Sequence, residues 1–202
     1  MARPTILILA AGSSSRMRGA DKLMEVVGGR PLVARAALAA LATGCPVVVT
    51  LPPDRPARAA SLEGLALTRV TVADTAEGLA ASLRSGLRGV SGPVLVLLAD
   101  LPEIGTEDLA TLIARHEAVP ERILRATAED GTPGHPVLFP GWVLPDLRAL
   151  QGDSGAREVL ARHRDRVEAV PLPGRRAVTD LDTPEDWAAW RAAQAASSTR
   201  AS

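Results

Sequence analysis

A glycine- and serine-rich turn follows the first apolar segment and carries the residues best suited to bind an anion. Gly12 to Ser15 can direct several backbone N–H groups and hydroxyls at one point, which is typical of a phosphate site. Arg16 and Lys22 add positive charge to the same loop. Lys22 is the only lysine among 23 basic residues, and a compact ammonium fits between phosphate oxygens where a planar guanidinium does not.

This loop predicts a triphosphate site, because the leaving pyrophosphate carries developing charge that needs neutralisation. Its spacing matches neither the P-loop pattern nor the dinucleotide G-x-G-x-x-G pattern. The alternative is a plain strand-loop-helix turn with charges on its surface.

Acidic residues follow a second apolar segment and precede a predicted helix. Asp100 comes after the segment 94–98, at a strand end where α/β sheets bind ligands. Mg²⁺ prefers one or two carboxylates together with phosphate oxygens and water, so Asp100 is a candidate ligand. Asp180 or Asp182 is a candidate second ligand, and we prefer Asp182. The alternative for these acids is capping of the next turn or helix.

Short β-rich segments alternate with helical patterns, which predicts an α/β fold. The expected layout is a three-layer α/β/α sandwich with a mostly parallel mixed sheet and helices on both faces. Residues 1–194 are expected to form one domain, and residues 195–202 a disordered tail. We predict strands at 5–9, 47–50, 69–72 and 94–98, helices at 31–41, 78–87, 107–117 and 187–195, and a hairpin or loop insertion over 123–139.

Composition limits the classes of function. The formal net charge is zero, which gives no overall field to attract nucleic acid or a membrane surface. No apolar run approaches the roughly 20 residues of a membrane span. Cys45 is the only cysteine, so an internal disulfide is excluded and we expect it to be a small buried side chain. We expect a cytoplasmic protein.

Five segments, in order, resemble the MobA/MocA-type nucleotidyltransferases, which have a glycosyltransferase-A-like fold. This Rossmann-like fold is that of the nucleotide-diphospho-sugar transferases. Where the family has DMP, this chain has Leu101 in place of methionine. The segments are LAAGSSSRMRGADKL (9–23), ADLPEI (99–104), GTPGHPVLF (131–139), GDSGAR (152–157) and DLDTPED (180–186).

The resemblance implies transfer of CMP from CTP to a phosphorylated acceptor, with release of pyrophosphate and a requirement for Mg²⁺. Ala11 belongs to the LAAG form of the loop, which favours CTP, whereas LAGG favours GTP. The implied acceptor is molybdopterin in the molybdenum cofactor, and a molybdenum hydroxylase is an implied partner. Related domains also act on sugar phosphates and other small phosphorylated alcohols.

The resemblance also implies a role for each site residue. Catalysis is expected from Arg16, Lys22 and Asp100, and metal binding from Asp100 and Asp182. The acceptor is expected to contact Pro102, His135, Asp153 and Arg157. Nucleotide binding is expected from Leu9, Ala10, Ala11, Gly12, Ser13, Ser14, Ser15, Arg16, Lys22, Gly78, Ser82 and Asp100, although Ser82 fits a plain helix N-terminus equally well.

Three other functions stay open. Some MocA-like proteins are named as NADPH-dependent nicotine blue oxidoreductases, and a guanylyltransferase would use GTP. A non-catalytic cofactor chaperone would bind nucleotide without releasing pyrophosphate. Arg16, Lys22 and Asp100 suit a metal triphosphate better than a nicotinamide, so nucleotidyl transfer is the preferred function.

Overall fold

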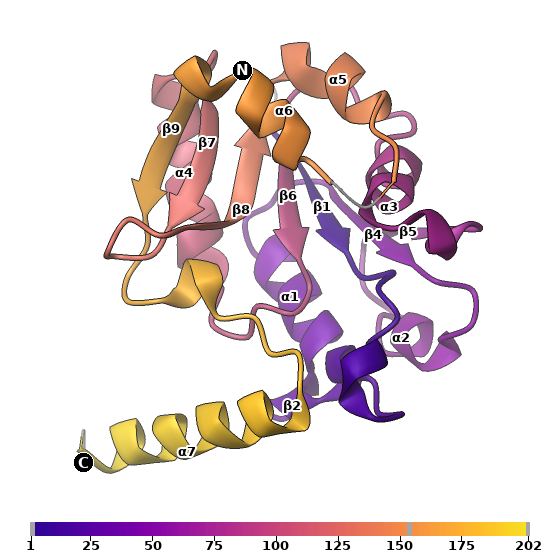
Figure 1. Cartoon of the computed structure of the whole chain (residues 1–202), viewed down its shortest axis with the longest axis vertical. Helices are drawn as coiled ribbons and strands as arrows, with labels where there is room; N and C mark the ends of the chain where they lie inside the picture. The colour runs from indigo at the N-terminus through magenta and orange to yellow at the C-terminus, as the bar shows by residue number, and fades with distance from the viewer. Residues whose placement is uncertain (1–2, 153–154, 201–202) are drawn as a thin grey trace.

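One seven-stranded sheet forms the centre of the protein (Figure 1). The structure, a computed structural model, describes residues 3–152 and 155–200. The strand order is β5-β4-β1-β6-β8-β7-β9, and β8 runs antiparallel to both of its neighbours while the other pairs are parallel. This is the mostly parallel mixed sheet predicted from the sequence. Its strands are β1 (Thr5–Leu9), β4 (Val47–Leu51), β5 (Thr68–Thr71), β6 (Val94–Leu98), β7 (Ile123–Thr127), β8 (Pro133–Phe139) and β9 (Val167–Pro171).

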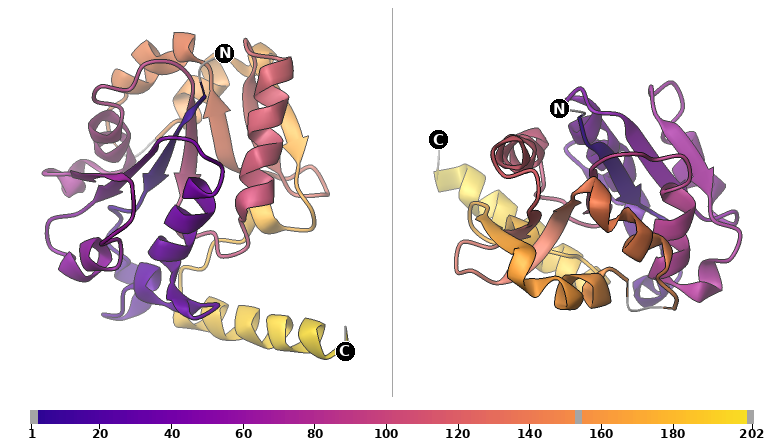
Figure 2. Two further views of the ribbon diagram at one scale, coloured as in Figure 1. Left: turned by 180° about the vertical axis from the view of Figure 1, so that it is seen from behind. Right: turned by 90° about the horizontal axis from the view of Figure 1, so that it is seen from above.

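Helices cover both faces of the sheet, which confirms the predicted three-layer α/β/α fold (Figure 2). On one face lie α1 (Leu32–Leu41) and α4 (Thr106–Ala118). The other face carries α3 (Leu79–Gly86), α5 (Leu144–Arg148) and α6 (Arg157–Arg162). The remaining elements are α2 (Pro56–Ala60), α7 (Pro184–Arg200) and the short hairpin β2 (Val26–Val27) and β3 (Arg30–Pro31).

Strand alternation produces two hydrophobic cores, one on each face of the sheet. Ile6 and Ile8 of β1 pack into the core beneath α1 and α4, whereas Leu7 and Leu9 pack into the core beneath α3, α5 and α6. A parallel strand buried on both faces reads as a continuous apolar run, and this is why β1 and β6 were recognisable in the sequence.

The C-terminal helix α7 is longer than predicted. Thr183 caps it, because the backbone N–H of Asp186 donates to Thr183 Oγ1 at 3.1 Å and that of Thr183 donates to Asp186 Oδ2 at 2.9 Å. The helix then continues through Arg200, where the sequence-based expectation was a disordered tail from residue 195. Alanine-rich sequence favours helix, and α7 projects away from the sheet in Figure 2.

The stretch expected as a hairpin or insertion forms the antiparallel hairpin β7–β8, which confirms the first of these alternatives, and β8 already begins at Pro133. The strand β9 and the helices α2 and α5 were not predicted. Cys45 is buried, as expected. Within the described residues, no helix combines the length and the apolar character needed to cross a membrane.

Candidate functional site

The candidate site lies where three loops meet at the carboxyl ends of β1 and β6. These strands pair in parallel with Leu9 opposite Leu98, so the loop after β1 and the residues after β6 leave the sheet side by side. The turn before α7 brings Asp182 to the same place. The sheet topology therefore brings together residues that are far apart in the sequence, at the edge where open α/β sheets bind ligands. These residues are Arg16, Lys22, Asp100 and Asp182.

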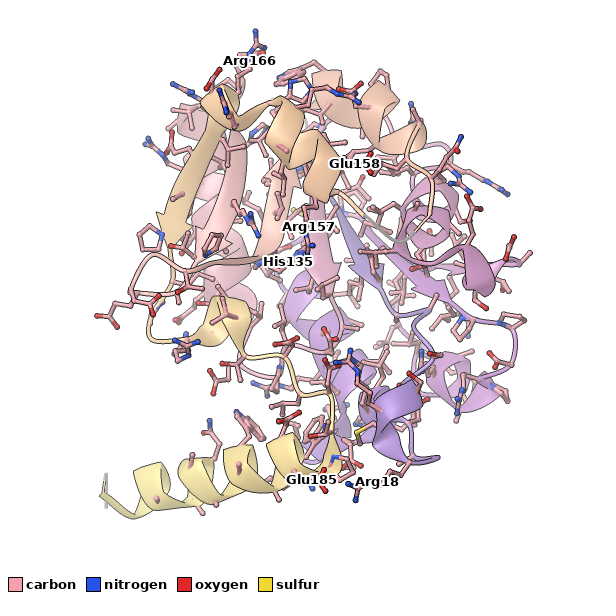
Figure 3. The ribbon with its side chains drawn as sticks, in the orientation of Figure 1. Arg18, His135, Arg157, Glu158, Arg166 and Glu185 are labelled. Carbon is pink, nitrogen blue, oxygen red and sulfur yellow. The ribbon has the colours of Figure 1, made fainter. Side chains whose placement is uncertain are left out.

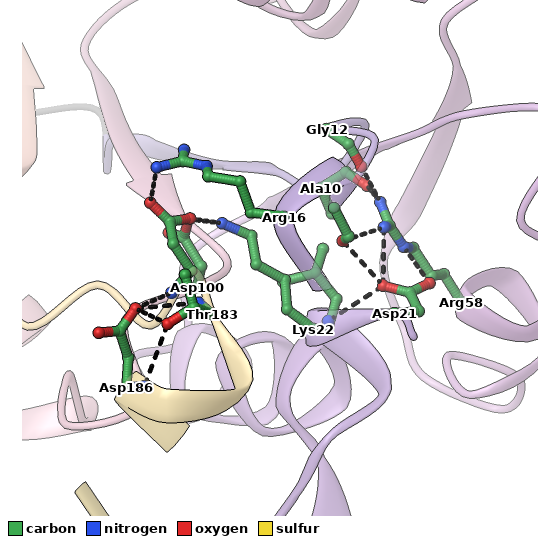
Figure 4. A network of polar contacts seen from close by, with 12 residues as sticks. Ala10, Gly12, Arg16, Asp21, Lys22, Arg58, Asp100, Thr183 and Asp186 are labelled. Atoms are coloured by element: carbon green, nitrogen blue, oxygen red, sulfur yellow. Dashed lines mark hydrogen bonds and ion pairs between the residues drawn. The ribbon is translucent and has the colours of Figure 1, made fainter. Parts of the chain in front are cut away.

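Lys22 joins the two acidic residues of this site (Figure 4). Its Nζ lies 2.6 Å from Asp100 Oδ2 and 2.7 Å from Asp182 Oδ1. Arg16 Nη1 lies 2.8 Å from Asp182 Oδ2, and the Arg16 side chain remains 69% exposed. Burial lowers the pKa of Lys22, but the two carboxylates outweigh burial and hold this pKa above its ordinary value. Lys22 is therefore a cation at neutral pH.

The carboxylates fit a divalent cation that also contacts phosphate. Asp100 and Asp182 converge on one position, and Asp100 Oδ1 is buried without a hydrogen-bond partner among the described residues. In that same part of the chain, no group of three or more His, Cys, Asp or Glu side chains could hold a metal ion. Two carboxylates completed by phosphate oxygens and water are the ligand set that Mg²⁺ favours.

Arg58, which the sequence analysis did not identify, organises the loop after β1. Its side chain is completely buried in α2 and uses all five N–H donors. Two of them reach the carbonyl oxygens of Ala10 and Gly12 at 2.7 and 2.8 Å, and a third reaches Ser14 Oγ at 3.0 Å. The remaining two bind the carboxylate of Asp21 at 2.7 and 2.8 Å.

These contacts turn the loop amides toward the open side of the loop. In a trans peptide the N–H points opposite to the preceding carbonyl, so the N–H groups of Ala11 and Ser13 point away from Arg58. Neither N–H donates a hydrogen bond to any residue that the structure describes. Ser14 adopts a left-handed conformation with φ of 55°, which bends the loop further. The loop thus presents unpaired donors, as an anion site requires.

Asp21 secures the end of this loop. It accepts from the backbone N–H of Leu23 at 3.1 Å and so caps the turn that carries Lys22. Burial raises the pKa of Asp21, but the Arg58 guanidinium outweighs it and holds the pKa below its ordinary value. Asp21 lies within the signature segment, whereas Arg58 stands in a short alanine-rich helix with no local pattern to mark it.

The residues expected near the base lie beside the loop. Ala11 is buried in a small cluster with Val72 and Ala81, so its methyl group closes one side of the loop. Gly78 has φ of 76° at the start of α3, a conformation that suits glycine. Ser82 is only 6% exposed, which leaves little of its hydroxyl open to a base.

The residues expected at the acceptor side are only partly brought together. His135 lies on β8 and Arg157 begins α6 (Figure 3). Burial lowers the pKa of His135 to about 4, helped by the charge of Arg125 and opposed by that of Asp100. Pro102 is buried, and its carbonyl accepts from Arg35 Nε of α1 at 3.2 Å. Asp153 lies outside the described residues.

Comparisons with known proteins agree with this geometry. The sequence profile of the MobA-like NTP transferase domain matches residues 6–167. A probable molybdenum cofactor guanylyltransferase from Natronomonas pharaonis is 37% identical over 197 residues, which cover 92% of this chain and 96% of that protein. The bifunctional protein GlmU from Mycobacterium sp. strain KMS is 33% identical over 139 residues, or 63% of this chain, but this chain spans only 28% of GlmU.

Among solved structures, a homologue of Mycobacterium tuberculosis Rv0371c from Mycobacterium sp. strain JC1 superposes with a TM-score of 0.82. The two chains are 28% identical, and the match covers 95% of this chain and 96% of the other. The chain therefore belongs to the MobA-like NTP transferase family.

Proposed function

We propose that this protein is a nucleotidyltransferase that transfers CMP from CTP to the phosphate of molybdopterin in the molybdenum cofactor. The observation that carries the proposal is the convergence of Lys22, Asp100 and Asp182 beside a loop with unpaired backbone donors. This arrangement provides positive charge and N–H groups for phosphates and two carboxylates for a divalent cation.

The proposed reaction needs positioning more than proton transfer. An oxygen of the acceptor phosphate attacks the α-phosphorus of CTP, and the bond from this phosphorus to the bridging oxygen breaks as pyrophosphate leaves in line. The acceptor phosphate is already ionised near neutral pH, so no general base is required. The N–H groups of Ala11 and Ser13, together with Arg16 and Lys22, bind and neutralise the triphosphate.

Asp100 and Asp182 would hold the Mg²⁺ ion. When bound, the ion supplies further neutralisation of the phosphate charge. Lys22 would contact both the carboxylates and the phosphates, because its ammonium stands between the carboxylates at the edge of the loop after β1. Arg16 contacts Asp182 with a largely exposed side chain, which leaves it free to turn toward a phosphate.

Two nucleotides are candidates, and different observations favour each. The packed methyl group of Ala11 narrows the loop beside α3, which supports the smaller base of CTP. GTP is the second candidate, because the relative from Natronomonas pharaonis is described as a probable guanylyltransferase. The variant Ala11→Gly removes this methyl group and should raise turnover with GTP relative to CTP.

A transfer assay tests the proposal. The protein is incubated with Mg²⁺, molybdenum-loaded molybdopterin and either CTP or GTP, while pyrophosphate is followed enzymatically and the product by mass spectrometry. We expect pyrophosphate and the cytosine dinucleotide with CTP. Formation of a guanine dinucleotide would show that the substrate is GTP and not CTP. NADPH oxidation with a quinone dye but no pyrophosphate release would support the oxidoreductase instead, and CTP binding without product would support a chaperone for a molybdenum hydroxylase.

A further inference from the structure

An arginine-lined cavity opens on the sheet face that carries α6. It has a volume of about 470 Å³, within the range of small-molecule sites. Arg125 and Thr127 of β7 line it from the sheet, and Arg157 and Arg164 line it from α6 and the following turn. Leu160 and Val167 add apolar walls. No carboxylate is found among the described residues that line the cavity.

The positive charge of this cavity is poorly neutralised. Arg125 is partly buried, and its Nε donates to the carbonyl oxygen of Gly134 at 3.2 Å, a neutral partner. Arg157 forms no hydrogen bond or ion pair with any residue that the structure describes. Arg164 has only a long contact of 3.6 Å with exposed Asp165. Three guanidinium groups around one apolar pocket indicate an anionic ligand.

A buried hydroxyl in the cavity wall also indicates a ligand. Thr127 is 3% exposed, and its Oγ1 has no hydrogen-bond partner in the described part of the chain. A buried unpaired polar group costs about 1–3 kcal/mol, so natural structures rarely retain one without a use. This observation is independent of the arginines, since it concerns a neutral group on the sheet itself.

The cavity and the carboxylate site belong to strands of one sheet that are separated only by β8. Val96 of β6 pairs with Val137 of β8, which pairs with Arg125 of β7. His135 lies on β8, which stands between β6 and β7 in the sheet. Two strand spacings separate β6 from β7, which corresponds to roughly 10 Å. An acceptor that extends across these strands can therefore contact both sites.

We propose that this cavity binds the non-reacting end of the acceptor through a second anionic group carried on a ring or other apolar body. The acceptor phosphate then faces the nucleotide near Lys22, while Arg157 and Arg164 hold the far end. This inference rests on the proposed function, and it defines the acceptor as a molecule with an anionic group at each end.

Titration calorimetry with phenyl phosphate tests the cavity directly. We compare the unmodified protein with Arg157→Ala/Arg164→Ala, whose two side chains are exposed and whose removal should not disturb folding. Arg162→Ala is the matched control, because Arg162 lies on α6 but pairs with Asp146 and does not line the cavity. We expect the double variant to bind about tenfold more weakly or worse, and the control to bind normally. Equal affinity in all three proteins would overturn the inference.

Steady-state transfer kinetics separate the inference from the proposed function. Arg157→Ala/Arg164→Ala should raise the KM for the acceptor about tenfold and leave the KM for CTP unchanged. Transfer with an unchanged acceptor KM in this variant would contradict the cavity assignment but not the proposed function. Arginine-dependent binding of phenyl phosphate by a protein that releases no pyrophosphate from any nucleoside triphosphate would support the cavity and contradict the proposed function.

Discussion

Lys22 sets the charge balance of the site at the scale of a single residue. Its ammonium is within hydrogen-bond distance of Asp100 and Asp182 and is mostly buried, with 14% of the side chain exposed. Two carboxylates this close would repel each other without a cation between them. A planar guanidinium has a fixed fork geometry, whereas the compact ammonium of Lys22 donates to both carboxylates at once.

Replacing Lys22 with alanine should lower turnover by orders of magnitude and leave the fold intact. The reason is that the triphosphate loses a preorganised charge in a largely water-excluded site. Turnover is measured by pyrophosphate release, and folding by circular dichroism. Lys22→Arg should recover only part of the activity. Arg18→Ala is the control in the same loop, because Arg18 is exposed and pairs with Glu185. Near-normal turnover in Lys22→Ala would remove its proposed role.

Gly12 offers a test that separates binding from stability. A Cβ atom built on Gly12 meets no protein atom within 4 Å, and its φ is not positive, so neither packing nor backbone conformation requires glycine there. We expect Gly12→Ala to unfold at the same denaturant concentration as the unmodified protein, yet to bind CTP and Mg²⁺ much more weakly because the methyl group obstructs the phosphates.

Gly86→Ala is the matched contrast to Gly12→Ala. A Cβ atom on Gly86 would lie 2.3 Å from Leu7 Cδ1 and 2.9 Å from Thr50 Cγ2 in the core beneath α3. We expect this variant to lose about 2 kcal/mol of unfolding free energy in urea titrations. If Gly12→Ala were destabilised as much as Gly86→Ala, the loop glycine would have a structural role instead of a ligand-binding one.

At the scale of elements, α2 and the loop after β1 behave as one unit because Arg58 joins them. Arg58→Met should lower the free energy of unfolding by about 3–5 kcal/mol, since it leaves the carboxylate of Asp21 and two carbonyl groups without their partner. The double variant Asp21→Asn/Arg58→Met should be less destabilised than Arg58→Met alone, because no unpaired charge remains. Urea titrations measure both.

Arg55→Ala is the control for Arg58→Met. Arg55 also donates to the loop, through Nη2 to the carbonyl of Ser13 at 3.1 Å, but this contact is exposed. Its removal should change stability by about 0.5 kcal/mol or less. A similar loss in Arg55→Ala and Arg58→Met would show that the buried network does not hold the loop.

The sequence predicts some residues of the site but not others. Lys22 and Asp100 were identifiable because each follows a strand with a continuous apolar pattern, and parallel neighbours end at the same edge. Arg58 was not identifiable, because the carbonyl groups that it contacts lie 46 and 48 residues away along the chain. The helix α2 itself spans only five residues, too few for a periodic pattern. Local patterns locate strand ends, but they do not report a long-range contact of one side chain.

At the scale of the whole molecule, the sheet consists of two parts that meet at β6. The parallel strands β5, β4, β1 and β6 position the phosphate-binding loop and Asp100, while β8, β7 and β9 position His135 and the arginine-lined cavity. The antiparallel strand β8 lies between β6 and β7 and links the two sites. We infer that the nucleotide occupies the first part and the acceptor the second, so transfer takes place at their boundary.

His135 at this boundary should give the stability of the protein a specific pH dependence. Burial lowers its pKa from 6.5 to about 4, so the folded protein keeps it neutral over a range in which the unfolded chain binds a proton. Because the unfolded state then binds more protons, the free energy of unfolding should fall as the pH decreases from about 6.5 to about 4, and the effect should level off below that.

The variant His135→Gln isolates this contribution from the carboxylates, which both proteins share. Lowering the pKa from 6.5 to about 4 corresponds to about 3 kcal/mol of unfolding free energy. Urea titrations of both proteins from pH 7 to pH 4 should therefore show that the unmodified protein loses more stability than the variant, with the difference growing mainly below pH 6.5. Parallel curves for the two proteins would mean that His135 takes up its proton in the folded state as readily as in the unfolded chain. The boundary between the two parts of the sheet would then be open to water, and the acceptor would meet a positively charged imidazole at mildly acidic pH.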